Sequence, residues 1–136
     1  MDYSTTLGKL WEFTDVFVIN VSSPNTPNLR DLQGEAELRK IIDSCNEVNE
    51  SKSTDYQLPP KPILIKIAPD MTFEQLEQII TVAMDSGCAG VVATNTTVSR
   101  DFDLIEDAKL GEKGGLSGLP LKVTSTEFIK HIYRFT

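Results

Sequence analysis

Three short runs of apolar residues, each leading into polar side chains, constrain the fold of this chain most strongly. They lie at residues 15–20, 63–67 and 90–95. Apolar runs of this length that do not alternate with polar residues are typical of strands buried on both faces of a parallel sheet. We therefore expect three buried parallel strands.

Helical patterns separate the expected strands. Apolar residues recur every three or four positions over residues 35–49, and a capping-box sequence at residues 72–75 opens a second helix. A weaker pattern covers residues 5–13, and an amphipathic one covers residues 124–135. Residues 49–62 are polar and end in several prolines, so we expect a loop insertion there.

The spacing of the strand ends indicates the architecture. Lys66 and Asn95 are 29 residues apart, and Asn20 and Lys66 are 46 residues apart. Without the expected insertion, both spacings approach ~31 residues, one eighth of a (β/α)8 barrel of ~250 residues. A whole barrel of that kind does not fit in 136 residues. The fold class is therefore α/β, as either a smaller open sheet or a partial (β/α)8 TIM barrel with parallel strands.

The charge and cysteine content of the chain argue against several classes of function. Thirteen Lys and Arg residues against twenty Asp and Glu residues give a formal net charge of -7, so we expect no nucleic-acid partner. Cys45 and Cys88 have no paired spacing, which predicts reduced core thiols and no zinc site. No apolar run approaches the ~20 residues of a membrane-spanning helix, and we expect no targeting or membrane segment in this chain.

Polar side chains follow all three expected strands, at the ends where parallel α/β proteins bind ligands. After the first strand, Asn20 and Asn25 each offer an amide acceptor and two donor hydrogens, which suits the alternating N–H and C=O edge of an amide or imide ring. The same segment is rich in Ser and Pro, so a turn-rich loop without a ligand also explains its composition.

The later polar residues have alternative interpretations too. Lys66 indicates a fixed positive charge beside an anion or a cofactor that becomes anionic; the alternatives are an ion pair with Asp70 and an edge residue that reaches water. The hydroxyls of residues 94–97 fit either binding or capping of the next element. Residues 111–118 hold four glycines that let a backbone approach a ligand, but match no nucleotide-binding fingerprint. His131 is expected to be structural.

Six polar segments share their order and spacing with a known enzyme family. They are residues 20–26 (Asn-Val-Ser-Ser-Pro-Asn-Thr), 29–30, 32–34, 66–70 (Lys-Ile-Ala-Pro-Asp), 94–100 and 114–118. These segments resemble class 2 dihydroorotate dehydrogenase. The resemblance implies an FMN-containing barrel that oxidises (S)-dihydroorotate to orotate in pyrimidine (UMP) biosynthesis and passes the electrons to a quinone. It also implies that residues 1–136 are a single segment, roughly the middle half of that barrel, incomplete at both ends.

The resemblance also implies roles for individual residues. Ser23 matches the family's proton acceptor. The matching substrate-binding positions are Asn20, Asn25, Asn95 and Thr96, and the matching flavin-binding positions are Asn20, Lys66, Thr94, Ser117 and Gly118. No metal ion is implied. For a eukaryotic parent enzyme the resemblance implies the mitochondrial inner membrane, with the quinone site outside residues 1–136.

Two other hypotheses stay open at this point. The chain is a truncated isoform without catalytic activity that serves as an interaction module, or it is an unrelated α/β ligand-binding domain with Asn and Lys at its strand ends. If the chain is a segment of the enzyme, we expect the isolated 136 residues neither to retain FMN nor to reduce a quinone, because an open half barrel exposes unpaired strand edges and the inner face of its sheet.

Overall fold

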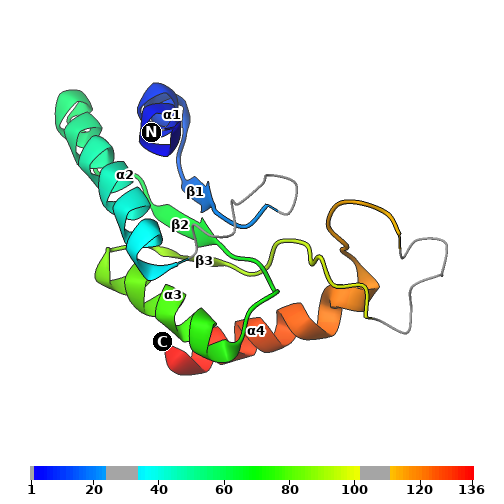
Figure 1. Cartoon of the computed structure of the whole chain (residues 1–136). Coiled ribbons are helices and arrows are strands. Elements are labelled where there is room, and N and C mark those ends of the chain that lie inside the picture. Colours follow the sequence, from blue (N-terminus) through cyan, green and yellow to red (C-terminus); the bar gives the residue numbers. More distant parts are fainter. Residues whose placement is uncertain (1, 24–33, 102–110) are drawn as a thin grey trace.

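The computed structural model describes residues 2–23, 34–101 and 111–136 of the chain. Within them, three strands form one parallel sheet in the order β1-β2-β3 (Figure 1). The strands are β1 (Phe17–Asn20), β2 (Ile63–Lys66) and β3 (Gly90–Val92). Their pairing places Asn20 beside Lys66, and Lys66 beside Val92. The predicted parallel α/β arrangement is thus confirmed in the described residues.

Four helices of the described residues form a layer against one face of this sheet. They are α1 (Asp2–Leu10), α2 (Glu35–Tyr56), α3 (Phe73–Asp85) and α4 (Lys122–Phe135). Helix α1 contacts α2, α2 contacts α3, and α3 contacts α4, so the helices follow one another around the sheet (Figure 1). Short 3-10 turns at Trp11–Phe13 and Leu119–Leu121 follow α1 and precede α4. The chain therefore repeats a unit of strand and covering helix.

The hydrophobic core lies between the sheet and this helical layer. Alternate strand side chains point into it, and Ile19, Ile63 and Ile65 are at most 4% exposed. Helices α2 and α3 contribute Leu38 and Leu76, which are both fully buried. Each such side chain stabilises the fold by about 1.5–3 kcal/mol relative to an exposed position. This packing holds the sheet, and with it the ends of the strands, in place.

The other face of the sheet is open in the described residues. Val18 is 48% exposed and Leu64 is half-buried, although both belong to apolar runs. Burial on both faces is therefore the wrong prediction for this part of the sheet, because the described helices pack on the opposite face. Asn20 and Lys66 lie on the open face too, two positions further along β1 and β2.

Helix α2 extends beyond its predicted end. Residues 49–56 are helical, so the prediction of a loop insertion over residues 49–62 is wrong for most of its length. Asn49 is buried and supports this extension. Its Oδ1 accepts from Trp11 Nε1 at 2.8 Å and from Lys61 N at 3.0 Å, and its Nδ2 donates to Lys61 O at 2.8 Å. An apolar periodicity does not detect a helical turn that is anchored by a polar side chain.

The other element boundaries lie close to the predicted ones. The capping box is present: Thr72 Oγ1 accepts from Gln75 N at 3.2 Å, and Gln75 Oε1 accepts from Thr72 N at 2.9 Å. Helices α1 and α4 begin earlier than predicted, and β1 and β3 are shorter than their apolar runs. Cys45 and Cys88 are free, and burial raises the pKa of each thiol to about 11, so both are protonated at neutral pH.

His131 joins α4 to α3. Its Nε2 lies 2.8 Å from Glu77 Oε1, and its ring stacks on Phe73 with 4.3 Å between the ring centroids. These contacts agree with the predicted structural role. In the described part of the chain, no group of three or more His, Cys, Asp or Glu residues is arranged so that it could bind a metal ion. None of the helices described there combines the length and apolar character needed to cross a membrane.

We expect Asn49→Ala to lower the free energy of unfolding by about 2–4 kcal/mol, because it leaves the buried Trp11 Nε1 and the Lys61 backbone without partners. Trp11 is the single tryptophan, so its fluorescence in a urea titration measures the change. The control is Glu50→Ala at the neighbouring exposed position, which should shift the value by less than ~0.5 kcal/mol. Equal unfolding midpoints for the two variants would contradict the role of Asn49.

Candidate functional site

The carboxyl ends of the three strands bring the polar segments together. The segments that follow β1, β2 and β3 leave the sheet on the same side, toward the right in Figure 1. Asn20 and Lys66 pair across the sheet, and Asn95 N donates to Ile67 O at 2.8 Å, which keeps the third segment beside the second. The structure therefore brings Asn20, Lys66 and Asn95 to one edge.

A hydrogen-bonded network joins the first segment to the third. Ser22 Oγ donates to Asn20 Oδ1 at 3.0 Å and accepts from Asn95 Nδ2 at 3.1 Å. Asn95 Nδ2 also lies 3.5 Å from Asn20 Oδ1. Ser22 is fully buried, whereas Asn20 is exposed. The network thus has a buried serine at its centre and an exposed asparagine at one end.

Three hydrogen-bond donors at this edge have no partner among the described residues. The Oγ1 of Thr94 is buried without a hydrogen bond. No described residue accepts from Asn20 Nδ2 or from Lys66 Nζ. A buried polar group without a partner costs about 1–3 kcal/mol, which a ligand with acceptor atoms offsets. An uncharged or anionic planar molecule with several acceptors, such as a flavin, fits this donor set.

Asp70 connects the segment after β2 to the segment after β3. Its carboxylate accepts from Thr97 Oγ1 and, at 3.3 Å, from Val98 N. Within the described residues Asp70 forms no ion pair with Lys66, so that alternative interpretation of the lysine is wrong. Thr97 is 2% exposed, and its Oγ1 also accepts from Ser99 N at 3.0 Å. Of the predicted hydroxyl run, Thr97 thus serves the structure of the loop.

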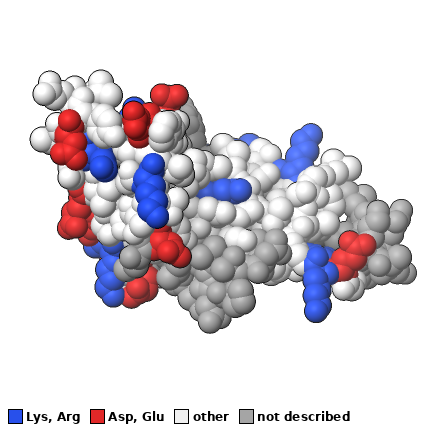
Figure 2. Space-filling view, turned by 90° about the horizontal axis from the view of Figure 1, so that it is seen from above, with Lys and Arg blue, Asp and Glu red and all other residues white. Residues whose placement is uncertain are grey.

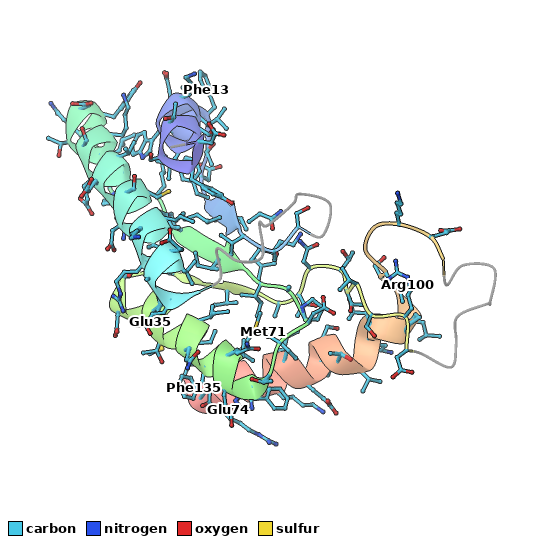
Figure 3. All side chains as sticks on the ribbon, viewed as in Figure 1. Phe13, Glu35, Met71, Glu74, Arg100 and Phe135 are labelled. Atoms are coloured by element: carbon cyan, nitrogen blue, oxygen red, sulfur yellow. The ribbon has the colours of Figure 1, made fainter. Side chains whose placement is uncertain are left out.

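Arg100 holds the glycine-rich segment against the loop that follows β3. Its Nη1 donates to the carbonyls of residues 97–99, at 3.1 to 3.4 Å. Its Nη2 donates to the carbonyls of Glu112 at 3.1 Å and Gly114 at 2.8 Å. Figure 3 shows Arg100 where the segment after β3 approaches the segment that leads to α4. One planar guanidinium therefore links two loops that are distant in sequence.

A backbone bridge next to Arg100 positions the predicted flavin-contact loop. Thr97 N donates to Leu116 O at 3.0 Å, and Leu116 N donates to Thr97 O at 2.7 Å. Ser117 follows directly and is exposed. Gly118 has a φ of 85°, which side chains with a Cβ rarely adopt, and no atom lies within 4 Å of the place of a Cβ. Backbone conformation, rather than close approach within the described residues, therefore explains this glycine.

The charged side chains on the open side are unevenly distributed. On the face shown in Figure 2, most of the acidic surface lies toward the end of the molecule on the left, and a further acidic patch lies toward the right end. The visible surface between them carries basic side chains and uncharged ones. In spite of the net charge of -7, the described side chains visible in this region do not oppose an anionic ligand.

The remaining sequence-predicted residues lie near the network or outside the described residues. Ser23 is half-buried and directly follows Ser22. Thr96 N donates to Asn95 Oδ1 at 2.9 Å. Asn25 lies outside the described residues. Sequence reasoning assigned no role to Ser22 and Arg100, which help to hold this edge together. It considered Asp70 only as an ion-pair partner of Lys66, and Thr97 only as part of the hydroxyl run of residues 94–97.

Substitution of Arg100 by Lys should speed amide hydrogen exchange at Leu116 by about 10-fold or more. A compact ammonium cannot donate to the carbonyls of both loops at once, as the planar guanidinium does. The Leu116 amide reports on this contact through its bond to Thr97 O. Arg134→Lys, in the exposed last turn of α4, is the control and should leave the rate unchanged. An unaltered rate in Arg100→Lys would show that the backbone bridge suffices without the guanidinium.

Known proteins match this chain along its length. A family model described as dihydroorotate dehydrogenase matches residues 1–136. The chain is 46% identical over 131 residues to a dihydroorotate dehydrogenase (quinone) of Christiangramia forsetii, and 40% identical over 136 residues to one of Chloroflexus aurantiacus. These alignments cover 96% and 99% of the chain but 36% and 38% of the relatives. The chain thus spans well under half the length of these relatives.

A solved structure gives the same result. The DHODH from Eimeria tenella, crystallised in complex with ferulenol, matches with a TM-score of 0.87 and 37% identity, over 99% of this chain and 39% of the other. This likeness confirms the predicted partial (β/α)8 barrel, and the family matches contradict the hypothesis of an unrelated ligand-binding domain. Membership also implies a flavin cofactor, in agreement with the donor set described above. The chain belongs to the dihydroorotate dehydrogenase family.

Proposed function

We propose that the protein that contains this chain oxidises (S)-dihydroorotate to orotate in pyrimidine biosynthesis, with FMN as cofactor and a quinone as final electron acceptor. Family membership supports the reaction, and relatives named as quinone-dependent support the acceptor. The single observation that carries the proposal is the set of donors without partners at the strand ends: Asn20 Nδ2, Lys66 Nζ and Thr94 Oγ1.

We propose further that residues 1–136 are one segment of the enzyme's barrel, incomplete at both ends. The relatives are nearly three times as long as their matched parts, since those parts are 36% and 38% of their length. The quinone site and further substrate and flavin contacts would then come from other parts of the enzyme. A mitochondrial inner membrane location, proposed only for a eukaryotic parent enzyme, gains no support from the bacterial relatives.

The residues present fit an FMN site. Lys66 would place a positive charge beside the cofactor, and the Thr94 hydroxyl would gain the partner that it lacks in the described residues. Asn20 would donate from Nδ2, and Ser117 and Gly118 would lie along the cofactor. Bound FMN supplies the acceptor for the hydride that leaves C6 of dihydroorotate. The Lys66 ammonium stabilises negative charge that builds up beside it.

Ser23 is the proposed proton acceptor. Its Oγ would take the proton from C5 of dihydroorotate, while Asn25, Asn95 and Thr96 orient the pyrimidine ring. A serine hydroxyl is a weak base near neutral pH, so the reaction requires a proton relay away from Ser23 and donors that stabilise the developing charge. The donors of Asn20 and Lys66 meet the second requirement.

A non-catalytic truncated isoform, acting as an interaction module, is the second candidate. The short coverage of the relatives favours it, because a product of this length would lack most of the parent barrel. The transcript that encodes the chain distinguishes the two. A continuous reading frame for further barrel strands supports the enzyme, and supported stop codons on both sides support the isoform.

In the full-length protein, Ser23→Ala should slow flavin reduction by dihydroorotate by about 100-fold or more and leave flavin content unchanged, because only the proton acceptor is lost. Anaerobic stopped-flow absorbance measures the reduction. Ser51→Ala on the exposed surface of α2 is the control and should reduce at the wild-type rate. Wild-type reduction by Ser23→Ala would exclude Ser23 as the proton acceptor.

The isolated 136-residue chain should purify without stoichiometric FMN and should not reduce a quinone, because much of the proposed cofactor site lies in other parts of the enzyme. The absorbance spectrum of the purified chain measures the flavin, with the full-length protein prepared in parallel as the positive control. One flavin per chain in the isolated segment would refute this division of the site.

A further inference from the structure

We infer that Ser22 is a positioning residue that fixes Asn20 as a hydrogen-bond donor, so that this edge of the sheet selects a ligand group that offers an acceptor. A carbonyl oxygen or a deprotonated ring nitrogen is such a group. The orientation follows from bonds within the chain alone. Only the choice of orotate as a probe rests on the proposed function.

Backbone donors determine the orientation of the Asn20 amide. An asparagine side chain has nearly the same shape when its amide is turned over, so its partners decide which atom points where. Ser22 N lies 3.2 Å from Asn20 Oδ1. A backbone N–H can only donate, so the atom that faces it must be the amide oxygen. The Nδ2 group of Asn20 therefore points away from Ser22.

Asn95 is oriented in the same way at the other end of the network. Thr96 N donates to Asn95 Oδ1 at 2.9 Å, so Asn95 turns its Nδ2 group toward Ser22 Oγ. Because the Ser22 hydroxyl accepts from Asn95 Nδ2, its own proton goes to Asn20 Oδ1, 3.0 Å away. The donor and the acceptor of each hydrogen bond are thus fixed along the network: Thr96 N donates to Asn95, Asn95 donates to Ser22, and Ser22 donates to Asn20.

The consequence for a ligand differs from the sequence-based expectation. Asn20 Oδ1 already accepts hydrogen bonds from Ser22 N, from Ser22 Oγ and, at 3.5 Å, from Asn95 Nδ2. Only the donor Nδ2 of Asn20 is left for a ligand, and Lys66 adds a second group that cannot accept. The expectation that Asn20 pairs with both the N–H and the C=O of a ring edge is therefore wrong for this arrangement.

Ser22 acts through its neighbours rather than on the ligand. Its exposed fraction is 0%, so a ligand on the open face does not reach its hydroxyl. Without that hydroxyl, Asn95 Nδ2 loses its closest acceptor and Asn20 Oδ1 loses one of its donors. Within the described residues, the Asn20 amide would then be held only by the backbone N–H of residue 22, at 3.2 Å, and by Asn95 Nδ2, at 3.5 Å, so it would present its donor to the ligand less firmly.

Asn20→Asp in the full-length protein separates donor from acceptor. The aspartate keeps the oxygen that Ser22 requires, replaces Nδ2 by a second oxygen of nearly the same size and adds a negative charge, whereas Asn20→Ala removes the donor without a charge. We expect orotate to bind at least about 100-fold more weakly by isothermal titration calorimetry, and Asn20→Ala to bind it about 10-fold more weakly. Affinity of Asn20→Asp equal to or above that of Asn20→Ala would overturn the assignment of Asn20 as a donor.

The role of Ser22 has a test that does not depend on any ligand. In full-length protein with 15N-labelled asparagine, Ser22→Ala should speed solvent exchange of the Asn95 Nδ2 protons by about 10-fold, and Ser22→Thr, which keeps the hydroxyl, should restore the slow rate. An unchanged rate in Ser22→Ala would overturn the inference. Should Ser22→Ala not fold, slow exchange in Ser22→Thr and weak orotate binding by Asn20→Asp support it, and fast exchange in Ser22→Thr overturns it.

The two readouts distinguish the inference from the proposed function. Wild-type protein that does not bind orotate, together with fast Asn95 exchange in Ser22→Ala, would refute the proposed ligand and support the positioning role. Wild-type protein that binds orotate, together with unchanged exchange, would support the proposed function and refute the role of Ser22.

Discussion

Asn20, Lys66 and Val92 lie in one row because β1, β2 and β3 pair in parallel register. A slip of one residue would turn Asn20 and Lys66 toward the helices and move apolar side chains to the open face. Burial of Ile19 and Ile65 against the helical layer opposes that slip. The apolar packing behind the sheet therefore determines where the polar groups in front of it stand.

The polar groups at the strand ends divide into those that are paired within the chain and those that are not. The first group links the loops to one another without a ligand. Asp70 joins the segment after β2 to Thr97 and Val98 in the segment after β3, and Arg100 joins the latter to the glycine-rich segment. Thr94 Oγ1 and Lys66 Nζ have no partner in the described residues. A buried polar group without a partner, such as Thr94 Oγ1, lowers the stability of a fold, so its presence beside a well-paired framework is typical of a binding site.

Local sequence patterns predicted the elements whose cause is local. The apolar runs located all three strands, and the capping box at Thr72 marked the start of α3, because neighbouring residues determine both. The extension of α2 was missed because Asn49 bonds to Trp11, which is 38 residues away. The contact of Arg100 with Gly114 was missed for the same reason, because the two residues belong to different segments. The orientation of the Asn20 amide was missed because it depends on where the folded backbone places the N–H of Ser22.

The open face of the sheet bears on the extent of the functional unit. Val18 is 48% exposed on that face, beside the polar groups of the strand ends, and the described residues pair no strand with the outer edge of β1 or of β3. Exposed apolar surface and unpaired strand edges favour association with further strands. In a closed barrel those strands would cover Val18 and lower the effective dielectric around Lys66, which strengthens its attraction for an anionic ligand. Closure of such a barrel would therefore shape the core and the binding site together, so stability and ligand affinity would depend on the same contacts with those strands.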